Sequence, residues 1–423
     1  MRLISILNSS NVKVRGGALY LATMISIVVA LILCMFLLLA KFNQRSISDF
    51  TQRSQLQCDL ESGFELARSK YYNESTNNQW IKLESLSDSI KVNRMPWGAY
   101  TVLTVSAKNH YHKVNKSGLF GTFMSKDTAI YVHENGKSIG IAGKFSVEGT
   151  CYFPQGTMKP VFIEGLSYEG SAINEKQIKR SNSKEIKLDE TFLNDLKAQY
   201  SFSENSDSMI FQLAQVTSNS FANKTVVYEC DRMNTAGITI KNNVKIIVKN
   251  NCVIDSSSKI ENAVIICKSA QFKKGFKGSV HVIASDSISV SDGCVFEFPS
   301  SFVLNASEMS SGFSSVVFYG KSCFKGSIIA QSLFDLKSSK SLIKLSKETE
   351  MMGVVFSGDQ LHLEGNIIGN VYTKSLIVKT ASAYYENHLM NCELNSSKYS
   401  SVLCAPRMLS NSVGLIKCKD LKS

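Results

Sequence analysis

The sequence predicts a mainly β protein in which a long N-terminal transmembrane and amphipathic helix precedes a parallel β-solenoid. Three observations indicate this class. The chain of 423 residues carries 23 consecutive residues without charge, proline or glycine, from Ala18 to Ala40. An amphipathic pattern continues beyond that stretch. Short β-like runs with recurring glycines fill the second half of the chain, from about Val226.

The apolar stretch has the length of a membrane span. At a rise of ~1.5 Å per residue, a helix over residues 18–40 crosses the ~30 Å hydrocarbon core of a bilayer and satisfies its own backbone. Arg2, Lys13 and Arg15 precede it without any acidic residue. The positive-inside rule therefore predicts that residues 1–17 form a cytoplasmic basic leader. A secretory signal has a shorter apolar core and a small-x-small cleavage site, whereas "KFNQRS" follows here.

The helix is expected to continue over residues 41–72, because neither glycine nor proline occurs from Ala18 to Ser62. Apolar residues recur there at steps of three and four, which places them on one face of a helix. The alternative to a continuous helix is a simple membrane anchor followed by a juxtamembrane coil. We expect the apolar face to pack on protein and interpret it as a contact for a partner helix: Phe50, Leu56, Leu60, Phe64 and Ala67.

The segment "RGGALYLATMISIVVALILCMFLLLA", followed by "LESGFELARS", resembles the N-terminus of type IV pilin-like proteins. It is most similar to pilus-assembly minor pilins and to atypical pseudopilins of type II secretion. The resemblance covers residues 13 to 70 and implies that a prepilin peptidase cuts between Gly17 and Ala18. Major pilins carry a glutamate at the fifth mature position, where this chain has Ala22. The resemblance therefore does not imply ordinary filament growth, and some atypical minor subunits also lack this glutamate.

A β-rich region with a hairpin is expected over residues 95–167. Alternation from Tyr100 to Val105 predicts a half-buried strand. Asn135-Gly136 stands between two apolar runs, which predicts a tight type I′ hairpin. A polar linker should follow over residues 168–225. It contains a short helix with Asp189 as N-cap and an inner face of Phe192, Leu193, Leu196 and Tyr200.

The β-solenoid is predicted over residues 226–395, ahead of a polar tail at 396–423. The segments that begin at Phe276, Phe324 and Leu363 share an apolar residue, a charge and a glycine before a short β run. Their unequal spacing is typical of stacked coils joined by loops of variable length. Glycine is needed where a corner requires a positive φ or a close backbone passage. An antiparallel sandwich or barrel is the alternative, although after Val226 only Asp292-Gly293 suggests a tight hairpin turn.

The 11 cysteines include no CxxC pair, and no zinc-ligand spacing is present. Five of the cysteines fall in or beside apparent strands and are expected to be buried thiols: Cys230, Cys252, Cys267, Cys294 and Cys323. If the body lies outside the cytoplasm, Cys392 with Cys404 is the favoured local disulfide. His110 and His112 share one face of an apparent strand without further ligands nearby. No metal and no cofactor are predicted.

Catalytic residues are not predicted either. Asp286 and Asp292 lie on one face of an unbroken strand, but six residues separate them by ~20 Å, too far for a working carboxylate pair. An odd number of positions separates His281 from Asp286, so on a strand their side chains should point to opposite faces. A membrane-tethered enzyme that acts on envelope polysaccharide is kept as the alternative function.

The net charge of +12 does not predict nucleic-acid binding, because the lysines are scattered singly along the chain. A local cluster joins Lys273, Lys274 and Lys277 to Phe272 and Phe276 and would suit a sugar or nucleic-acid chain, but a basic corner of the solenoid is the favoured interpretation. A glycan-binding adhesin that uses the basic outer face is a further alternative, and polysaccharide contact stays open.

The sequence thus predicts a membrane-anchored structural or assembly component of the bacterial cell envelope, minor-pilin-like and without catalysis. Its expected location is the cytoplasmic membrane, with a single pass, the N-terminus inside, and the body in the periplasm or outside the cell. Its expected partners are the membrane and other envelope or pilin-like proteins, contacted through the N-terminal helix.

Overall fold

The computed structural model describes residues 16–69, 72, 76–82, 88–170, 175–183, 186–201, 215–306, 314–334, 340–400, 403–409 and 415–421. Strands account for 54% of the structure, so the predicted mainly β class is confirmed. The chain divides into two compact units, Met1–Asp59 and Leu60–Ser423. Of the predicted leader, only residues 16 and 17 are described, and the polar tail is described in part.

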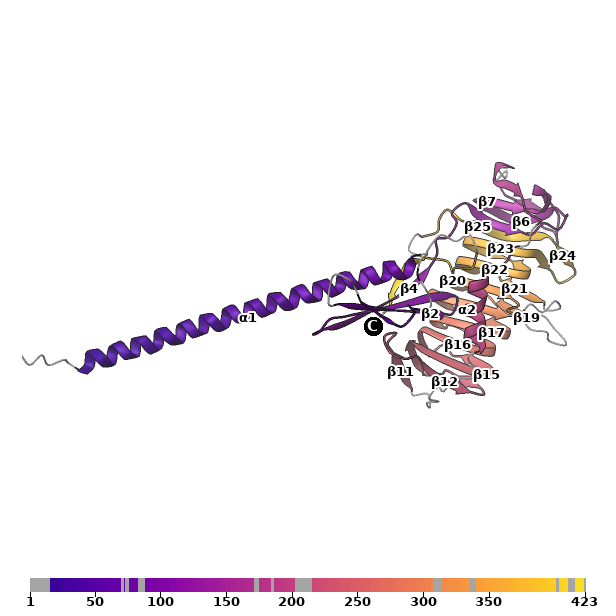
Figure 1. The fold of residues 1–423 in the computed structure, drawn as a ribbon. Helices are drawn as coiled ribbons and strands as arrows, with labels where there is room; N and C mark the ends of the chain where they lie inside the picture. The colour runs from indigo at the N-terminus through magenta and orange to yellow at the C-terminus, as the bar shows by residue number, and fades with distance from the viewer. Residues whose placement is uncertain are drawn as a thin grey trace, which may run out of the picture. The chain divides into compact units, whose positions relative to one another are not determined.

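The N-terminal helix α1 (Gly16–Arg68) is a single element of 53 residues, drawn in indigo in Figure 1. At ~1.5 Å per residue its length is ~80 Å. The helix runs without a break through the apolar stretch and the polar stretch that follows it. A long apolar N-terminal helix is therefore confirmed, and the alternative of a juxtamembrane coil is wrong.

A five-stranded antiparallel sheet follows the helix in the chain. Its order is β1 (Trp80–Lys82), β2 (Ser89–Trp97), β3 (Tyr100–Lys108), β4 (Lys113–Gly121) and β26 (Ile416–Leu421). The strand predicted from Tyr100 to Val105 lies within β3. This strand is buried along both faces, because Gly63 of α1 lies against Val105 while the Thr104 hydroxyl on the other face donates to the Phe221 carbonyl at 3.3 Å.

A second sheet holds the other strands, and its neighbours run parallel except for the pair β23–β24. The first part of the chain contributes β5 (Thr128–Val132), β6 (Ile139–Glu148), β7 (Thr150–Phe153), β8 (Met158–Pro160), β9 (Tyr168–Glu169) and β10 (Ile178–Arg180). The middle contributes β11 (Val216–Asn219), β12 (Val226–Cys230), β13 (Met233–Asn234), β14 (Thr239–Asn242), β15 (Val244–Ile254), β16 (Lys259–Phe272), β17 (Lys277–Val290) and β18 (Val295–Asn305). The last part contributes β19 (Ser314–Phe318), β20 (Ser322–Gln331), β21 (Ser341–Leu345), β22 (Thr349–Leu363), β23 (Gly365–Lys379), β24 (Tyr384–Glu386) and β25 (His388–Asn395).

The parallel sheet closes on itself, and this corrects the predicted β-solenoid. Strand β17 pairs through its first half with β18 and through its second half with β19. In the same way β22 pairs with β20 and with β21. Since β18 pairs with β20 and β19 with β21, six parallel strands form a ring. The parallel pairing was predicted correctly, but the sheet forms a closed six-strand barrel and not a solenoid.

The barrel interior is packed with aromatic rings. Adjacent centroids lie as close as 4.8 Å, between Phe302 and Phe324. Each ring has at most 1% of its surface exposed, and the group comprises Phe272, Phe276, Phe296, Phe302, Phe318 and Phe324. Tilted and edge-to-face packing of this kind stabilises a core beyond the burial of its area. Phe276 and Phe324 begin two of the apolar-charge-glycine segments, so the repeated pattern did mark core positions.

A column of glycines shows where the repeated pattern was misaligned. Gly326, Gly353 and Gly369 stand opposite one another on β20, β22 and β23, each with φ near +147°. A Cβ on Gly353 would lie 1.7 Å from the Gly326 carbonyl oxygen, so only glycine fits. The sequence had aligned Phe324 with Leu363, whereas the register sets Phe324 opposite Met351 and Met351 opposite Ile367.

The predicted hairpin at Asn135-Gly136 is wrong. Strand β5 pairs in parallel with β23 and β7, and β6 pairs in parallel with β25, β8 and β9. The segment between β5 and β6 is therefore a connection between parallel strands. The predicted short helix is present as α2 (Glu190–Ser201), and Asp189 caps it by accepting from the amides of Thr191 and Phe192. Single-turn 3₁₀ helices occur at Pro154–Gly156 and Glu175–Gln177.

Candidate functional site

The apolar part of α1 exposes its side chains. Leu31, Leu37 and Phe42 are each more than 60% exposed, and none of the most apolar part of the helix is buried. A continuous apolar surface of this size is expected to meet lipid or protein. The helix is long and apolar enough for a membrane span or for a signal sequence. Hydroxyls within it are satisfied locally, since Thr23 donates to the Tyr20 carbonyl and Ser26 to the Ala22 carbonyl, each at 2.8 Å.

The two residues of the predicted cleavage site lie in the first turn of α1. The helix begins at Gly16, and Gly17 and Ala18 follow. A Cβ built on Gly17 would meet no atom within 4 Å. The cut between Gly17 and Ala18 remains a prediction.

The last turns of α1 pack on the antiparallel sheet. The Phe64 ring stacks on Phe120 of β4 with centroids 5.6 Å apart, and the Lys417 ammonium lies 5.5 Å from the Phe64 centroid. Arg68 donates from Nε to the Leu415 carbonyl at 2.7 Å. These contacts join the end of the helix to β4 and to the segment that leads into β26.

The predicted partner-helix face is divided by this packing. Leu60, Phe64 and Ala67 are at most 4% exposed, and the chain's own second unit covers them, so they are not available to a partner. Phe50 and Leu56 belong to the first unit, and Phe50 is 75% exposed. Of the predicted face, Phe50 offers the accessible aromatic side chain.

The disulfide differs from the predicted one. Cys404 bonds to Cys418, in the segment after the barrel and in β26, and so closes a loop over a sequence separation of 14. Cys392 of β25 is a free thiol that is 2% exposed, and its side chain belongs to the main hydrophobic core. The expectation of buried thiols holds for Cys252, Cys267 and Cys294, whereas Cys230 and Cys323 are half-buried. Burial raises the pKa of the Cys252 thiol to about 12.

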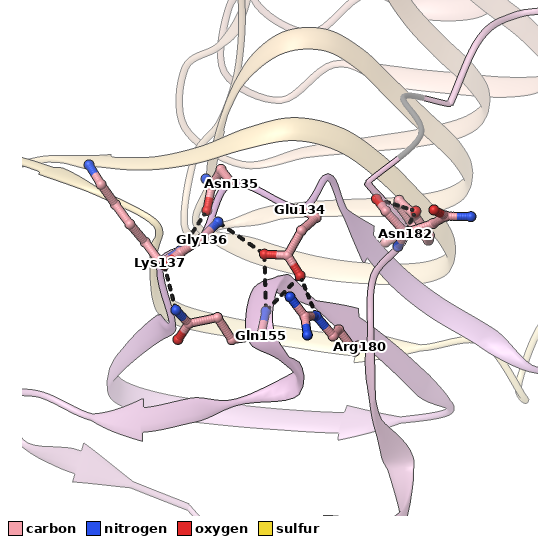
Figure 2. Close-up of polar contacts among 8 residues, drawn as sticks. Glu134, Asn135, Gly136, Lys137, Gln155, Arg180 and Asn182 are labelled. Atoms are coloured by element: carbon pink, nitrogen blue, oxygen red, sulfur yellow. Dashed lines mark hydrogen bonds and ion pairs between the residues drawn. The ribbon is translucent and has the colours of Figure 1, made fainter.

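A polar corner joins β5 to β7 and β10, and Figure 2 shows it in detail. The Glu134 carboxylate accepts from the amides of Gly136 at 2.9 Å and Gln155 at 3.0 Å, and from Arg180 Nε at 2.9 Å. The Gln155 amide first, and then Arg180, hold the pKa of Glu134 below its ordinary value. A reciprocal amide pair links Asn135 to Asn387. These contacts give the Glu134 carboxylate a structural role, and it is a poor candidate for catalysis.

Asp286 and Asp292, the carboxylates that the enzyme alternative would use, also have structural partners. Asp286 accepts from the Ser269 hydroxyl at 3.1 Å, while Asp292 pairs with Lys274 at 3.2 Å and accepts from the Lys321 amide at 3.0 Å. His281 is fully buried with Nδ1 2.8 Å from the Ser301 hydroxyl, and burial lowers its pKa to about 3. These contacts give no support to the enzyme alternative.

Two further expectations from the sequence are corrected. His110 and His112 lie in the turn between β3 and β4 and not on a strand face. Over the part of the chain that the structure describes, no three His, Cys, Asp or Glu side chains form a metal-binding group. The basic cluster at 272–277 does not present aromatic rings to solvent, because Phe272 and Phe276 point into the barrel and have no exposed surface.

A cleft lies between α2 with its preceding residues and the parallel sheet. Its volume is about 400 Å³. Its floor includes Phe356, Tyr372 and Tyr131, and Lys187 and Lys197 line its α2 side. The sequence analysis did not identify it, since the neighbours β5 and β23 are far apart in the chain. The alternation in "AIYVH" was the available signal, because it sets Tyr131 on the face opposite the buried Ile130.

Comparison with known proteins gave no match: neither a family model, nor a curated protein, nor a solved structure is similar to this chain.

Proposed function

We propose that the chain is a membrane-anchored structural component of a bacterial cell-envelope assembly, minor-pilin-like in role and without catalysis. The observation that carries this proposal is the single helix α1. Its first part exposes apolar side chains over a length that fits a bilayer, and its last turns, from Leu60, pack on the antiparallel sheet. In this role the helix sits in the cytoplasmic membrane with its N-terminus inside, and the body stands in the periplasm or outside the cell.

The packing at the end of α1 suits an assembly part. Gly63 brings the helix so close to β3 that a Cβ there would lie 2.5 Å from Val105 Cγ1. With Phe64 stacked on Phe120, the last turns of the helix form part of the hydrophobic packing of the sheet. A load applied to these turns is therefore passed to the sheet through close contacts and not through a mobile linker.

The polar stretch of α1 after the apolar part is the proposed contact for partner helices. Phe50 is 75% exposed there, and Asp49 and Arg53 form an ion pair at 3.5 Å on the same stretch. An exposed aromatic residue on a helix is a suitable anchor for a second helix, since burying it removes a large apolar surface from water.

A photo-reactive amino acid placed at Phe50 tests this role in the native envelope. Under the proposal, irradiation yields a crosslinked product that contains a second single-pass membrane protein. The matched control places the same amino acid at Tyr319, which is 58% exposed on the body. If Phe50 gives no protein product, or the same product as Tyr319, the assembly role of α1 is wrong.

A further inference from the structure

A row of aromatic residues crosses one face of the parallel sheet. Successive strands set Phe356 opposite Tyr372, Tyr372 opposite Tyr131, and Tyr131 opposite Tyr152. These four residues, which we call the tyrosine row, come from β22, β23, β5 and β7. Neighbouring parallel strands lie ~4.8 Å apart, so the row presents a continuous aromatic strip. The rings of Tyr131 and Tyr152 have centroids 5.6 Å apart.

The tyrosine row runs out of the cleft. Phe356 and Tyr372 are buried on the cleft floor beside α2, whereas Tyr131 and Tyr152 are half-buried and reach solvent. The position of Tyr131 is fixed, because its hydroxyl accepts from the Asn182 amide at 2.9 Å. The cleft volume of about 400 Å³ falls within the ~300–1,000 Å³ of small-ligand pockets.

Cations surround this strip. Lys187 is exposed and Lys197 half-buried on the α2 side of the cleft, and the Lys179 ammonium lies 5.9 Å from the Tyr152 centroid at the far end of the row. Lys374 also lines the cleft but lies near the Asp359 carboxylate. Glu190 is the acidic residue among those that line the cleft. The polar lining also includes Asn194, Gln331 and His133, together with hydroxyl side chains.

We propose that the cleft and the tyrosine row bind a short segment of an acidic polysaccharide of the uronic-acid type. The sugar rings lie with their C–H faces on Tyr131 and Tyr152, and a carboxylate lies between Lys187 and Lys197. This site is independent of the assembly role proposed above.

Two other ligand classes fit the cleft less well. A peptide that extends a sheet needs an unpaired strand edge, but β22 and β23 are paired with neighbours on both sides. A nucleic acid needs a track of cations along its phosphates, whereas an aromatic strip separates Lys187 and Lys197 on the α2 side from Lys179 beside Tyr152.

Calorimetric titration of the full chain in detergent micelles with tetragalacturonate tests the proposal. We expect saturable binding by the wild-type chain and about tenfold weaker binding by a K187Q/K197Q variant, which loses two charge-assisted contacts. Y152A should weaken binding to a similar extent by removing one stacking surface. The fully methyl-esterified tetrasaccharide should bind at least about tenfold more weakly than the acid.

Two matched controls separate a built site from general attraction. The K159Q/K224Q variant removes two exposed lysines outside the cleft, and Y319A removes an exposed tyrosine outside the row. Both should bind like the wild type. Absence of saturable binding, equal binding of the methyl ester, or an equal loss in the controls would overturn the proposal. Tighter binding of an oligothymidylate, lost in K187Q/K197Q, would assign the cleft to nucleic acid instead.

Discussion

At the scale of single residues, His281 occupies a site that favours its neutral form. The ring is fully buried, it contacts the edge of Tyr100 at 6.0 Å between centroids, and burial lowers its pKa to about 3. An unfolded chain would take up a proton on this residue near its ordinary pKa of 6.5. Protonation of His281 therefore favours unfolding.

The burial of neutral His281 makes the free energy of unfolding depend on pH. Between pH 6.5 and about 3 the unfolded state binds a proton that the folded state does not, so the free energy of unfolding falls as the pH falls. The slope from this residue is up to ~1.4 kcal/mol per pH unit. Urea unfolding at pH 7 and pH 5 should show a smaller difference for H281Q than for the wild type. An exposed control, H110Q, should keep the wild-type difference, and equal differences for all three would contradict the account.

Gly353 gives the second prediction at this scale. G353A places a Cβ within 1.7 Å of the Gly326 carbonyl oxygen and forces alanine to φ +146°, so we expect a loss well above the ~1–2 kcal/mol of left-handed strain alone. Thermal unfolding measures it. G237A is the matched control, since Gly237 has φ +70° but no atom within 4 Å of its Cβ position, and it should lose only the strain. Equal losses in the two variants would show that the glycine column is not tightly packed.

At the scale of elements, Trp97 and Gln199 attach the turn between β2 and β3 to the rest of the body. The Trp97 indole donates to the Asn262 carbonyl at 2.6 Å. The Gln199 side chain of α2 accepts from the Gly98 amide at 2.8 Å and donates to the Gly98 carbonyl at 2.9 Å. Because both side chains are at most 2% exposed, the antiparallel sheet, α2 and the parallel sheet are held together by buried polar contacts.

The disulfide secures the edge of the antiparallel sheet. C418S should release β26, because a crosslink over 14 residues contributes ~3 kcal/mol against unfolding. Limited trypsin digestion should then cleave at Lys417 and Lys419 faster than in the wild type. The control is C323S, which changes a free and half-buried thiol. Unchanged cleavage in C418S would mean that β26 is held by its pairing with β4 alone.

The sequence predicted elements where local pattern decides them. Alternation located β3, and an N-cap followed by helical spacing located α2, because both depend on residues close in the chain. The Asn135-Gly136 pattern predicted a hairpin that is not formed. The partners of that segment are remote in the sequence: Asn387, Gln155 and Arg180. Pairing of Cys404 with Cys418 depends on the position of β26 beside β4 and has no local signal.

At the scale of the whole molecule, parallel pairing was predictable and closure was not. Recurring glycines and scarce hairpin turns indicated stacked parallel strands. The ring that closes the barrel depends on β17 and β22 each pairing with two different neighbours along their length. Strand register decides this, and irregular steps such as that between Gly278 and His281 leave no mark in the sequence. The cleft was missed for the same reason, because it joins β5 to β23.

The mass of the intact chain extracted from membranes tests the account's central claim most directly. The account predicts a membrane-bound chain that keeps α1 and starts at Ala18. A chain that starts at Met1 would show that the predicted cut between Gly17 and Ala18 does not occur, while leaving the anchor. A freely soluble chain that lacks the residues up to Ala40 would contradict the account, because α1 would then be a discarded signal.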